Sequence, residues 1–142
     1  MSETYGNNKI FKKEIAEQLQ LAGHDVIADA KYKTLFGSFK KADAVIYLPV
    51  GNIHPEKVGV FARYQHVNGS MLEKMPFLID SVINAIKSGT FDSALIVVDG
   101  EPLEALEDYY KQKMSECPSL HVVNNKQFSV LLNEDFFSLF NS

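Results

Sequence analysis

The stretch GVFARYQHVNGSMLEK, Gly59 to Lys74, predicts a strand, then a turn at Asn68-Gly69, then the start of a helix. Arg63 is the only arginine of the chain, and it lies on the same face of the predicted strand as Gln65, two residues further on. Arg63 has two interpretations. It can be an ordinary exposed charge of the strand, for which the chain otherwise uses lysine, or it can occupy a position that needs a planar, forked cation.

Hydrophobic spacing extends the pattern in both directions from the third strand, which is expected at Lys57–Gln65. The segments expected before it are a helix and two strands, at Asn8–Ala22, His24–Asp29 and Ala42–Val50. The segments expected after it are helices at Leu72–Ile86, Leu103–Met114 and Gln127–Phe140, and strands at Ser93–Asp99 and Leu120–Val123. The short gaps between the first three strands indicate an antiparallel meander. The order αβββαβαβα predicts an α/β fold in which helices flank a mixed sheet.

The composition fits one domain over residues 1–142, because 46% of the residues are hydrophobic and 23% are charged. No apolar run approaches the length of a membrane span, and the first residues, MSETYGNNK, lack the apolar core of a signal peptide. We therefore expect a cytoplasmic protein that has no membrane partner. The single cysteine, Cys117, excludes an internal disulfide and a cysteine-rich zinc site.

The net charge of −4 argues against a protein that coats nucleic acid non-specifically, but the charge is unevenly distributed. The chain carries ten basic and eight acidic residues up to Lys74, and four basic and ten acidic residues after it. A polyanion is therefore expected to contact the first half of the chain.

Asp43 is expected at the start of the second strand, in the fragment KKADAVIYL, whose later residues have the composition of a buried strand. A carboxylate in such a strand is costly unless it is solvated, paired or bound to a cation. One interpretation is an edge aspartate beside Lys40 or Lys41, and the other is a carboxylate that binds a cation.

The order αβββαβ, with an aspartate on the second strand, resembles the PD-(D/E)XK nuclease superfamily, whose members have the restriction-endonuclease-like fold. KKADAVIYL is similar to the aspartate strand of that family, and VFARYQHVNGSMLEKMPF is similar to its motif strand and the turn that follows. The resemblance covers roughly residues 8 to 100 and implies a restriction-endonuclease-like core with a C-terminal αβα extension. It also implies Mg²⁺ held by acidic side chains, next to a positive side chain that orients the attacking water or stabilises charge on phosphorus.

Matched residue by residue, Asp43 takes the aspartate position of the family and Phe61 takes the position of the second acid. Arg63 takes the lysine position, and Gln65 takes that of a glutamine that often follows. Phe61 cannot ligate a metal, and Arg63 keeps the positive charge but does not readily release a proton. A metal site built on Asp43 and the carbonyl of Ala62 alone would be weak.

The missing acid could come from the first helix, because that helix often contributes an acid in the family. Glu14 and Glu17 are the candidates, and the alternative for both is a solvated position on the polar face of the helix. If the site is active, the resemblance implies that Asp43, Arg63, Gln65 and Glu17 are catalytic and that Asp43 ligates Mg²⁺.

Phosphate contacts with DNA are expected from Arg63, Ser70 and Lys74. The guanidinium fork can bind a phosphate at two points, and Ser70 lies among the N–H groups of the expected helix start, one turn before Lys74. The alternative is a strand, a turn and a capped helix, in which Ser70 and Glu73 form a capping box without any ligand.

Three functions are open on the sequence. The first is a non-cutting DNA-binding or assembly subunit with a degenerate metal site. The second is an active, magnesium-dependent endodeoxyribonuclease whose second acid is displaced. The third is a small α/β protein that binds a partner protein and no nucleic acid, which the acidic second half favours. The apolar tail at 127–140 is expected to be buried by a second copy in a homodimer, by a partner subunit or by the chain's own core.

Overall fold

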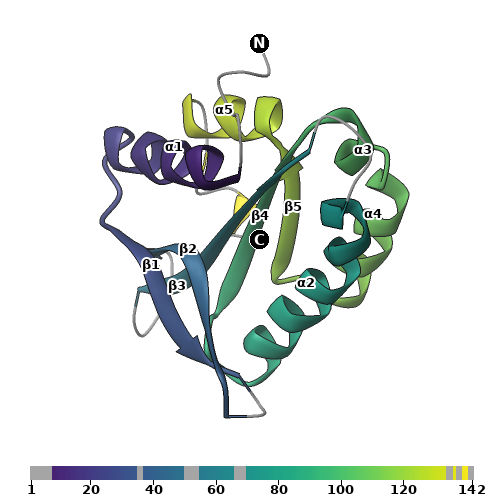
Figure 1. The fold of residues 1–142 in the computed structure, drawn as a ribbon. Helices are drawn as coiled ribbons and strands as arrows, with labels where there is room; N and C mark the ends of the chain where they lie inside the picture. Colours follow the sequence, from purple (N-terminus) through teal and green to yellow (C-terminus); the bar gives the residue numbers. More distant parts are fainter. Residues whose placement is uncertain are drawn as a thin grey trace.

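A computed structural model describes residues 8–34, 37–49, 55–65, 70–133, 136 and 139–140, apart from the side chains of Ser70 and Met71. Within these residues, the helices are α1 (Asn8–Leu21), α2 (Ser70–Lys87), α3 (Glu101–Glu104), α4 (Glu107–Glu116) and α5 (Asn125–Asn133). The strands are β1 (Val26–Lys33), β2 (Phe39–Leu48), β3 (Glu56–Tyr64), β4 (Ser93–Asp99) and β5 (Leu120–Asn124), as Figure 1 shows. The predicted turn at Asn68-Gly69 and the predicted strand end at Val50 lie outside the described residues.

The strands β1 to β5 form a sheet in the order of the sequence. β1, β2 and β3 pair antiparallel, whereas β3, β4 and β5 pair parallel. Parallel neighbours need a crossover connection, which α2 supplies between β3 and β4 and which α3 and α4 supply between β4 and β5. The meander, the mixed sheet and the α/β class expected from the sequence are therefore confirmed.

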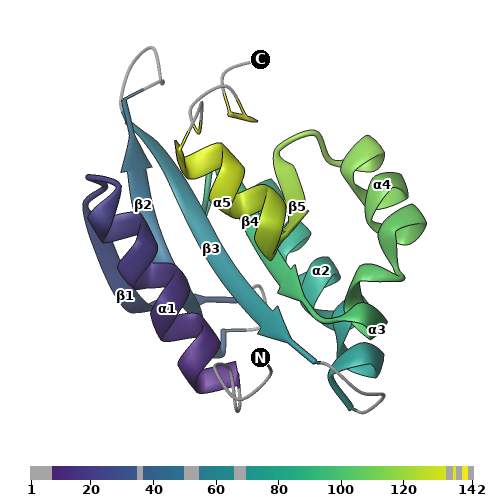
Figure 2. The same cartoon turned by 90° about the horizontal axis from the view of Figure 1, so that it is seen from above.

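Helices cover both faces of this sheet (Figures 1 and 2). On the face that we call the α1 side, Phe11 of α1 and Phe128 of α5 pack against the strands. On the opposite face, the α2 side, Met75 of α2, Leu103 of α3 and Tyr110 of α4 do the same. As far as the described residues extend, none of these helices is both long and apolar enough to cross a bilayer.

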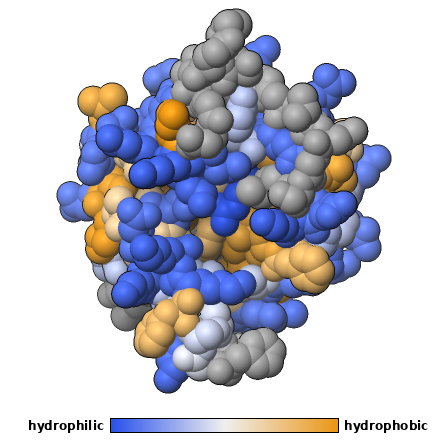
Figure 3. Space-filling model, viewed as in Figure 1, coloured by the Kyte–Doolittle hydropathy of each residue, from blue (hydrophilic) through white to orange (hydrophobic). Residues whose placement is uncertain are grey.

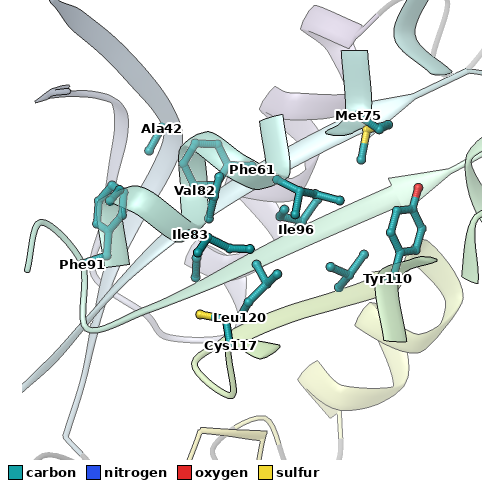
Figure 4. Packing of buried hydrophobic residues seen from close by; sticks show 14 of the residues in the cluster. Ala42, Phe61, Met75, Val82, Ile83, Phe91, Ile96, Tyr110, Cys117 and Leu120 are labelled. Atoms are coloured by element: carbon teal, nitrogen blue, oxygen red, sulfur yellow. The ribbon is translucent and has the colours of Figure 1, made fainter. Parts of the chain in front are cut away.

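Three aromatic rings pack together on the α2 side. Phe61 of β3, Tyr32 of β1 and Phe91 just before β4 make mutual edge-to-face contacts, with ring centroids 5.1 to 6.3 Å apart. Figure 4 shows the rings of Phe61 and Phe91 in one cluster with Ala42 and Val82. Phe61 is 1% exposed, so it is a core residue of the fold.

Two strand boundaries differ from the prediction. β1 continues past Asp29 to Lys33, and β2 begins at Phe39 rather than at Ala42. Asp43 therefore lies inside β2 and not at its start. The added segments are rich in lysine and mostly exposed, so they lack the apolar alternation by which a sequence predicts strands.

The prediction of one helix over Leu103–Met114 is wrong, because the chain turns between α3 and α4 at Ala105 and Leu106. The Tyr110 hydroxyl donates a hydrogen bond of 2.7 Å to the carbonyl of Leu103. In a continuous helix that carbonyl would accept from the N–H group four residues on. The buried hydroxyl therefore replaces part of the helical bonding that the turn removes.

The apolar C-terminal segment packs on the chain itself. α5 ends at Asn133, earlier than the expected helix end at Phe140. Phe128, Phe136 and Phe140 are 0%, 5% and 9% exposed in the core of the α1 side. Of the three alternatives expected for the tail, the structure shows burial by the chain's own core for these three rings. Phe137, also part of the expected apolar surface, lies outside the described residues.

Gly59 of β3 lies against the ring of Phe91. A Cβ atom added at Gly59 would lie 2.9 Å from Cε2 of that ring, and Phe91 is only 2% exposed, so the ring has little room to move. We expect Gly59→Ala to lower the free energy of unfolding by about 1–3 kcal/mol in urea denaturation. In a Phe91→Leu background the same substitution should cost less, and an equal cost in both backgrounds would contradict this packing.

Candidate functional site

The β ladder is interrupted beside Asp43. The last pair of β2 with β3 is Ala44 opposite Val60, so Asp43, the residue that precedes Ala44 in the chain, has no ladder partner on β3. In the pairing of β1 with β2, Ala28 pairs with Ala44 and Ala30 with Ala42, but Asp29 and Asp43 between them do not pair. Asp29 has a φ of 49°. Aspartate is one of the few residues that adopt this left-handed backbone conformation. The regular ladder is therefore broken next to Asp43 on both sides.

The interruption changes the face of the sheet on which side chains lie. Side chains two apart in a regular strand share a face. Ala44 nevertheless packs on the α1 side, whereas Ala42 packs on the α2 side. β1 makes the same change between Val26 on the α1 side and Tyr32 on the α2 side. The distal half of the β1–β2 hairpin is therefore rotated toward α2, and Asp43 lies where the rotation occurs.

Asp43 is surrounded by donors from α1 and β3. Its Oδ2 accepts hydrogen bonds of 2.8 Å from Arg63 Nη1 and from the backbone N–H group of Ala62. Its Oδ1 lies 3.6 Å from Nζ of Lys12 on α1. Arg63 Nη1 also donates to the carbonyl of Ala62 at 2.7 Å. Two positive side chains and one N–H group thus share a single carboxylate.

Most of this ion pair is shielded from solvent. The side chains of Asp43 and Arg63 are 8% and 15% exposed, while Lys12 is 36% exposed. A shielded pair interacts more strongly than a surface pair, but both charges lose hydration, so the removal of either partner leaves an uncompensated charge. Together with Lys12, the pair therefore fixes β2, β3 and α1 relative to one another.

The arrangement does not fit a magnesium site. Mg²⁺ requires oxygen ligands in near-octahedral geometry, whereas Phe61, which the sequence comparison matched to the second acid, is a buried ring. Both oxygens of Asp43 face positive side chains, which would repel a metal ion. Among the residues that the structure describes, no three Asp, Glu, His or Cys side chains lie close enough together to hold a metal ion. The described acids therefore do not complete a metal site around Asp43.

The acids of α1 do not contact Asp43 in the described structure. Glu17 is exposed, and its side chain leaves the helix roughly 140° away from that of Lys12. Glu14 accepts a hydrogen bond of 3.4 Å from Gln18 on the same helix. Lys12 is thus the α1 residue that reaches Asp43, and the catalytic role of Glu17 stays a prediction.

Of the residues predicted to contact phosphate, Arg63 lies in the site. Within the described residues its Nε and Nη2 make no hydrogen bond, and the side chain as a whole is 15% exposed. Lys74 is exposed on α2. The side chain of Ser70, and with it the predicted capping box, lies outside the described structure.

Two amide side chains join the end of β3 to helices. The Oε1 atom of Gln65 accepts a hydrogen bond of 3.2 Å from the N–H group of Leu72, near the start of α2. Asn8 of α1 bonds Tyr64 twice, donating to its carbonyl at 2.9 Å and accepting from its N–H group at 2.7 Å. Gln65 thus helps to position α2, and its predicted catalytic role stays a prediction.

The sequence prediction of the site missed Asn8 and Lys12. They are four residues apart on α1, so they lie on the same helix face, and both contact residues of the site. That spacing is the signal that could have placed them together. Because amides and lysines are common on solvated helix faces, the spacing alone does not distinguish a buried contact.

Exposed lysines lie on the elements that flank Asp43. On α1 and on the β1–β2 hairpin, these lysines are Lys9, Lys13, Lys31, Lys33, Lys40 and Lys41, and we call them the basic surface. The acidic residues Glu101, Glu104, Glu107, Asp108 and Glu116 lie on α3 and α4, at the opposite edge of the sheet (Figures 1 and 2). Figure 3 shows hydrophilic side chains over much of one face, with hydrophobic patches between them. Exposed acids such as Glu17 on α1 and Asp29 on β1 lie among these lysines, so lysines are in excess on these elements without excluding acids.

A family model described as a PD-(D/E)XK nuclease superfamily domain matches residues 2–136. The chain therefore belongs to the PD-(D/E)XK nuclease superfamily, as its resemblance to the family indicated. A search of curated proteins found no match. Among solved structures, the chain is similar to the crystal structure of a protein of unknown function, AF1548, with a TM-score of 0.54 and 11% identity. That match covers 83% of this chain and 58% of the other, and it supports the fold alone.

A double-mutant cycle measures the coupling of Asp43 with Arg63. We expect Arg63→Met to lower the free energy of unfolding by about 2–3 kcal/mol, because it leaves the shielded carboxylate with Lys12 as its remaining cation. Combined with Asp43→Asn, the loss should be smaller than the sum of the two single losses. Lys111→Met, which breaks an exposed pair with Glu107, is the control and should change stability little. Additive losses would contradict the described ion pair.

Proposed function

We propose that the chain is a DNA-binding member of the PD-(D/E)XK superfamily that does not cut DNA. One observation carries the proposal. At the position that matches the family's metal-binding aspartate, the Asp43 carboxylate is bound by Arg63 and Lys12 of the same chain. A protein cation thus stands where a nuclease of this family needs a metal cation.

The chemistry of hydrolysis supports the non-cutting part of the proposal. A nuclease site of this family needs hard oxygen ligands to hold a metal that activates water and polarises the phosphate. Phe61 supplies no oxygen ligand, and the charge of Asp43 is already offset. An arginine side chain is a poor general base in proteins, so it is not suited to take a proton from water. Binding of phosphate needs none of these groups, so it can persist without cleavage.

The distribution of charge supports the DNA-binding part. Nε and Nη2 of Arg63 donate no hydrogen bond within the described residues, and the basic surface extends on both sides of this residue, on α1 and on the hairpin. Lys31 and Lys41 stand directly opposite each other in the ladder, so their charges add at one place. Phosphate contacts of this kind give binding that is strong at low salt and depends little on sequence. We expect the duplex to lie along α1 and the hairpin, away from α3 and α4.

The salt dependence of DNA binding tests the proposal. Fluorescence anisotropy with a short labelled duplex should show affinity that falls steeply and linearly, on logarithmic axes, as salt rises. Arg63→Ala, and separately Lys41→Ala, should each weaken binding at low salt and reduce the slope by about one. Lys126→Ala removes an exposed lysine of α5, outside the basic surface, and should leave the slope unchanged.

Two outcomes would overturn the proposal. If the duplex does not bind at low salt, the DNA-binding part fails, and the interpretation as a partner-binding α/β protein takes its place. If the duplex is nicked in Mg²⁺ by the wild type and stays intact with Asp43→Ala, the non-cutting part fails.

A further inference from the structure

A cavity of about 270 Å³ lies between the distal half of the β1–β2 hairpin and α2. The hairpin contributes Tyr32 and Lys40, and α2 contributes Phe77, Ser81 and Asn84, which follow one another about a helical turn apart. The rotation of the hairpin toward α2 forms this cavity, because it brings Tyr32 against the helix. The volume lies near the lower end of the range for ligand pockets, so it suits one small ligand.

The charge of the cavity favours an anionic ligand. Lys33 and Lys40 line it, and within the described residues neither forms an ion pair. Nζ of Lys40 donates a hydrogen bond of 3.3 Å to Ser81, which leaves its other donors open. Asp80 is the acid among the described lining residues; it lies 3.8 Å from Nζ of Lys113, which also lies 3.7 Å from Glu116.

An exposed ring at the cavity favours a planar ligand. Phe77 is 74% exposed, although burial of such a ring is favourable. It lines the same cavity as the buried ring of Tyr32 and the methyl group of Ala85. A planar, aromatic ligand could stack on Phe77 and cover the surface that the chain leaves open.

Hydroxyl and amide groups supply directional hydrogen bonds. Thr34 and Ser38 lie in the hairpin segment, with their hydroxyl oxygens 2.7 Å apart. On the helix, Asn84 presents an exposed carboxamide, which both donates and accepts hydrogen bonds. The edge of a nucleobase carries the same mixture of donors and acceptors.

We propose that this cavity binds one nucleotide, with the base stacked on Phe77 and the phosphate bound by Lys40 and Lys33. Cationic, aromatic and amide groups at one place match the phosphate, the ring face and the ring edge of such a ligand. The nucleotide can come from a duplex as an everted base or from solution as a free mononucleotide. Because a free nucleotide needs no duplex, the inference stands or falls separately from the DNA-binding proposal.

The ion pair of Asp43 also influences Tyr32, which lines the cavity. Burial raises the pKa of Tyr32, a hydrogen bond with Ser81 and the positive charge of Arg63 lower it, and the negative charge of Asp43 raises it.

Binding of deoxyadenosine monophosphate tests the proposal. Calorimetry should show saturable binding, and the amide resonances of Ser81 and Asn84 should shift in NMR spectra. Phe77→Ala should weaken binding about tenfold through lost stacking. Lys40→Ala should weaken it about fivefold, whereas Lys40→Arg should largely restore it.

Matched controls separate the cavity from general surface effects. Tyr47→Ala removes another exposed aromatic ring and Lys126→Ala another exposed lysine, both away from the lining, and neither should change binding. Absence of saturable binding would overturn the proposal, as would inorganic phosphate binding as tightly as the nucleotide. Affinity that is unchanged by both Phe77→Ala and Lys40→Ala would overturn it as well.

A duplex that contains one 2-aminopurine distinguishes the two sources. A rise in fluorescence with the wild type that Phe77→Ala abolishes would support the proposal with an everted base as the ligand. Unchanged fluorescence together with binding of the mononucleotide would support it with the free nucleotide as the ligand. In the anisotropy experiment, Phe77→Ala should bind the labelled duplex with the same salt dependence as the wild type. A failure of the DNA-binding proposal would therefore be seen in that experiment and not in the binding of the mononucleotide.

Discussion

The carboxylate of Asp43 is the group on which the local architecture depends. It bonds Arg63 of β3 and lies close to Lys12 of α1. At this residue the pairing of β2 with β3 has ended and the pairing of β2 with β1 is interrupted. A charge this deep in a sheet is stable only because these partners offset it. The rotation of the hairpin occurs at the same level and carries Tyr32 onto α2. The packing of the sheet, the ion pair and the cavity beside α2 are therefore parts of one arrangement.

The charge of this carboxylate is compensated by side chains of the chain itself. The strands that carry Asp43 and Arg63, β2 and β3, lie side by side, so polar groups of both strands are brought close together inside the fold. A metal ion can compensate the charge of such a site, and here Arg63 and Lys12 do so. Phe61 then adds a core ring in place of a second acid, in contact with Tyr32 and Phe91. Asp43, Arg63 and Phe61 thus contribute to the ionic and hydrophobic framework of the protein.

The sequence predicted those elements whose signal is local. Ser93–Asp99 is a continuous apolar run and forms β4 with those bounds, and the spacing from Leu72 to Ile86 lies within α2. The hairpin extension was missed because its lysine-rich strands form through pairing and not through apolar alternation. The resemblance to the family placed Asp43 and Arg63 at neighbouring positions, and they do form an ion pair. Lys12 was missed because its contact with Asp43 depends on how α1 packs on the sheet, which no local pattern encodes.

Titration with Mn²⁺, followed by NMR, tests the central claim that Asp43 is bound by protein cations and not by a metal. A paramagnetic ion bound at this carboxylate would broaden the amide resonances of Ala62 and Arg63. We expect these resonances to keep their line widths in the wild type as Mn²⁺ is added, while any broadening at exposed acids of α3 and α4 serves as an internal control. Saturable broadening at Ala62 and Arg63 that disappears with Asp43→Asn would contradict it.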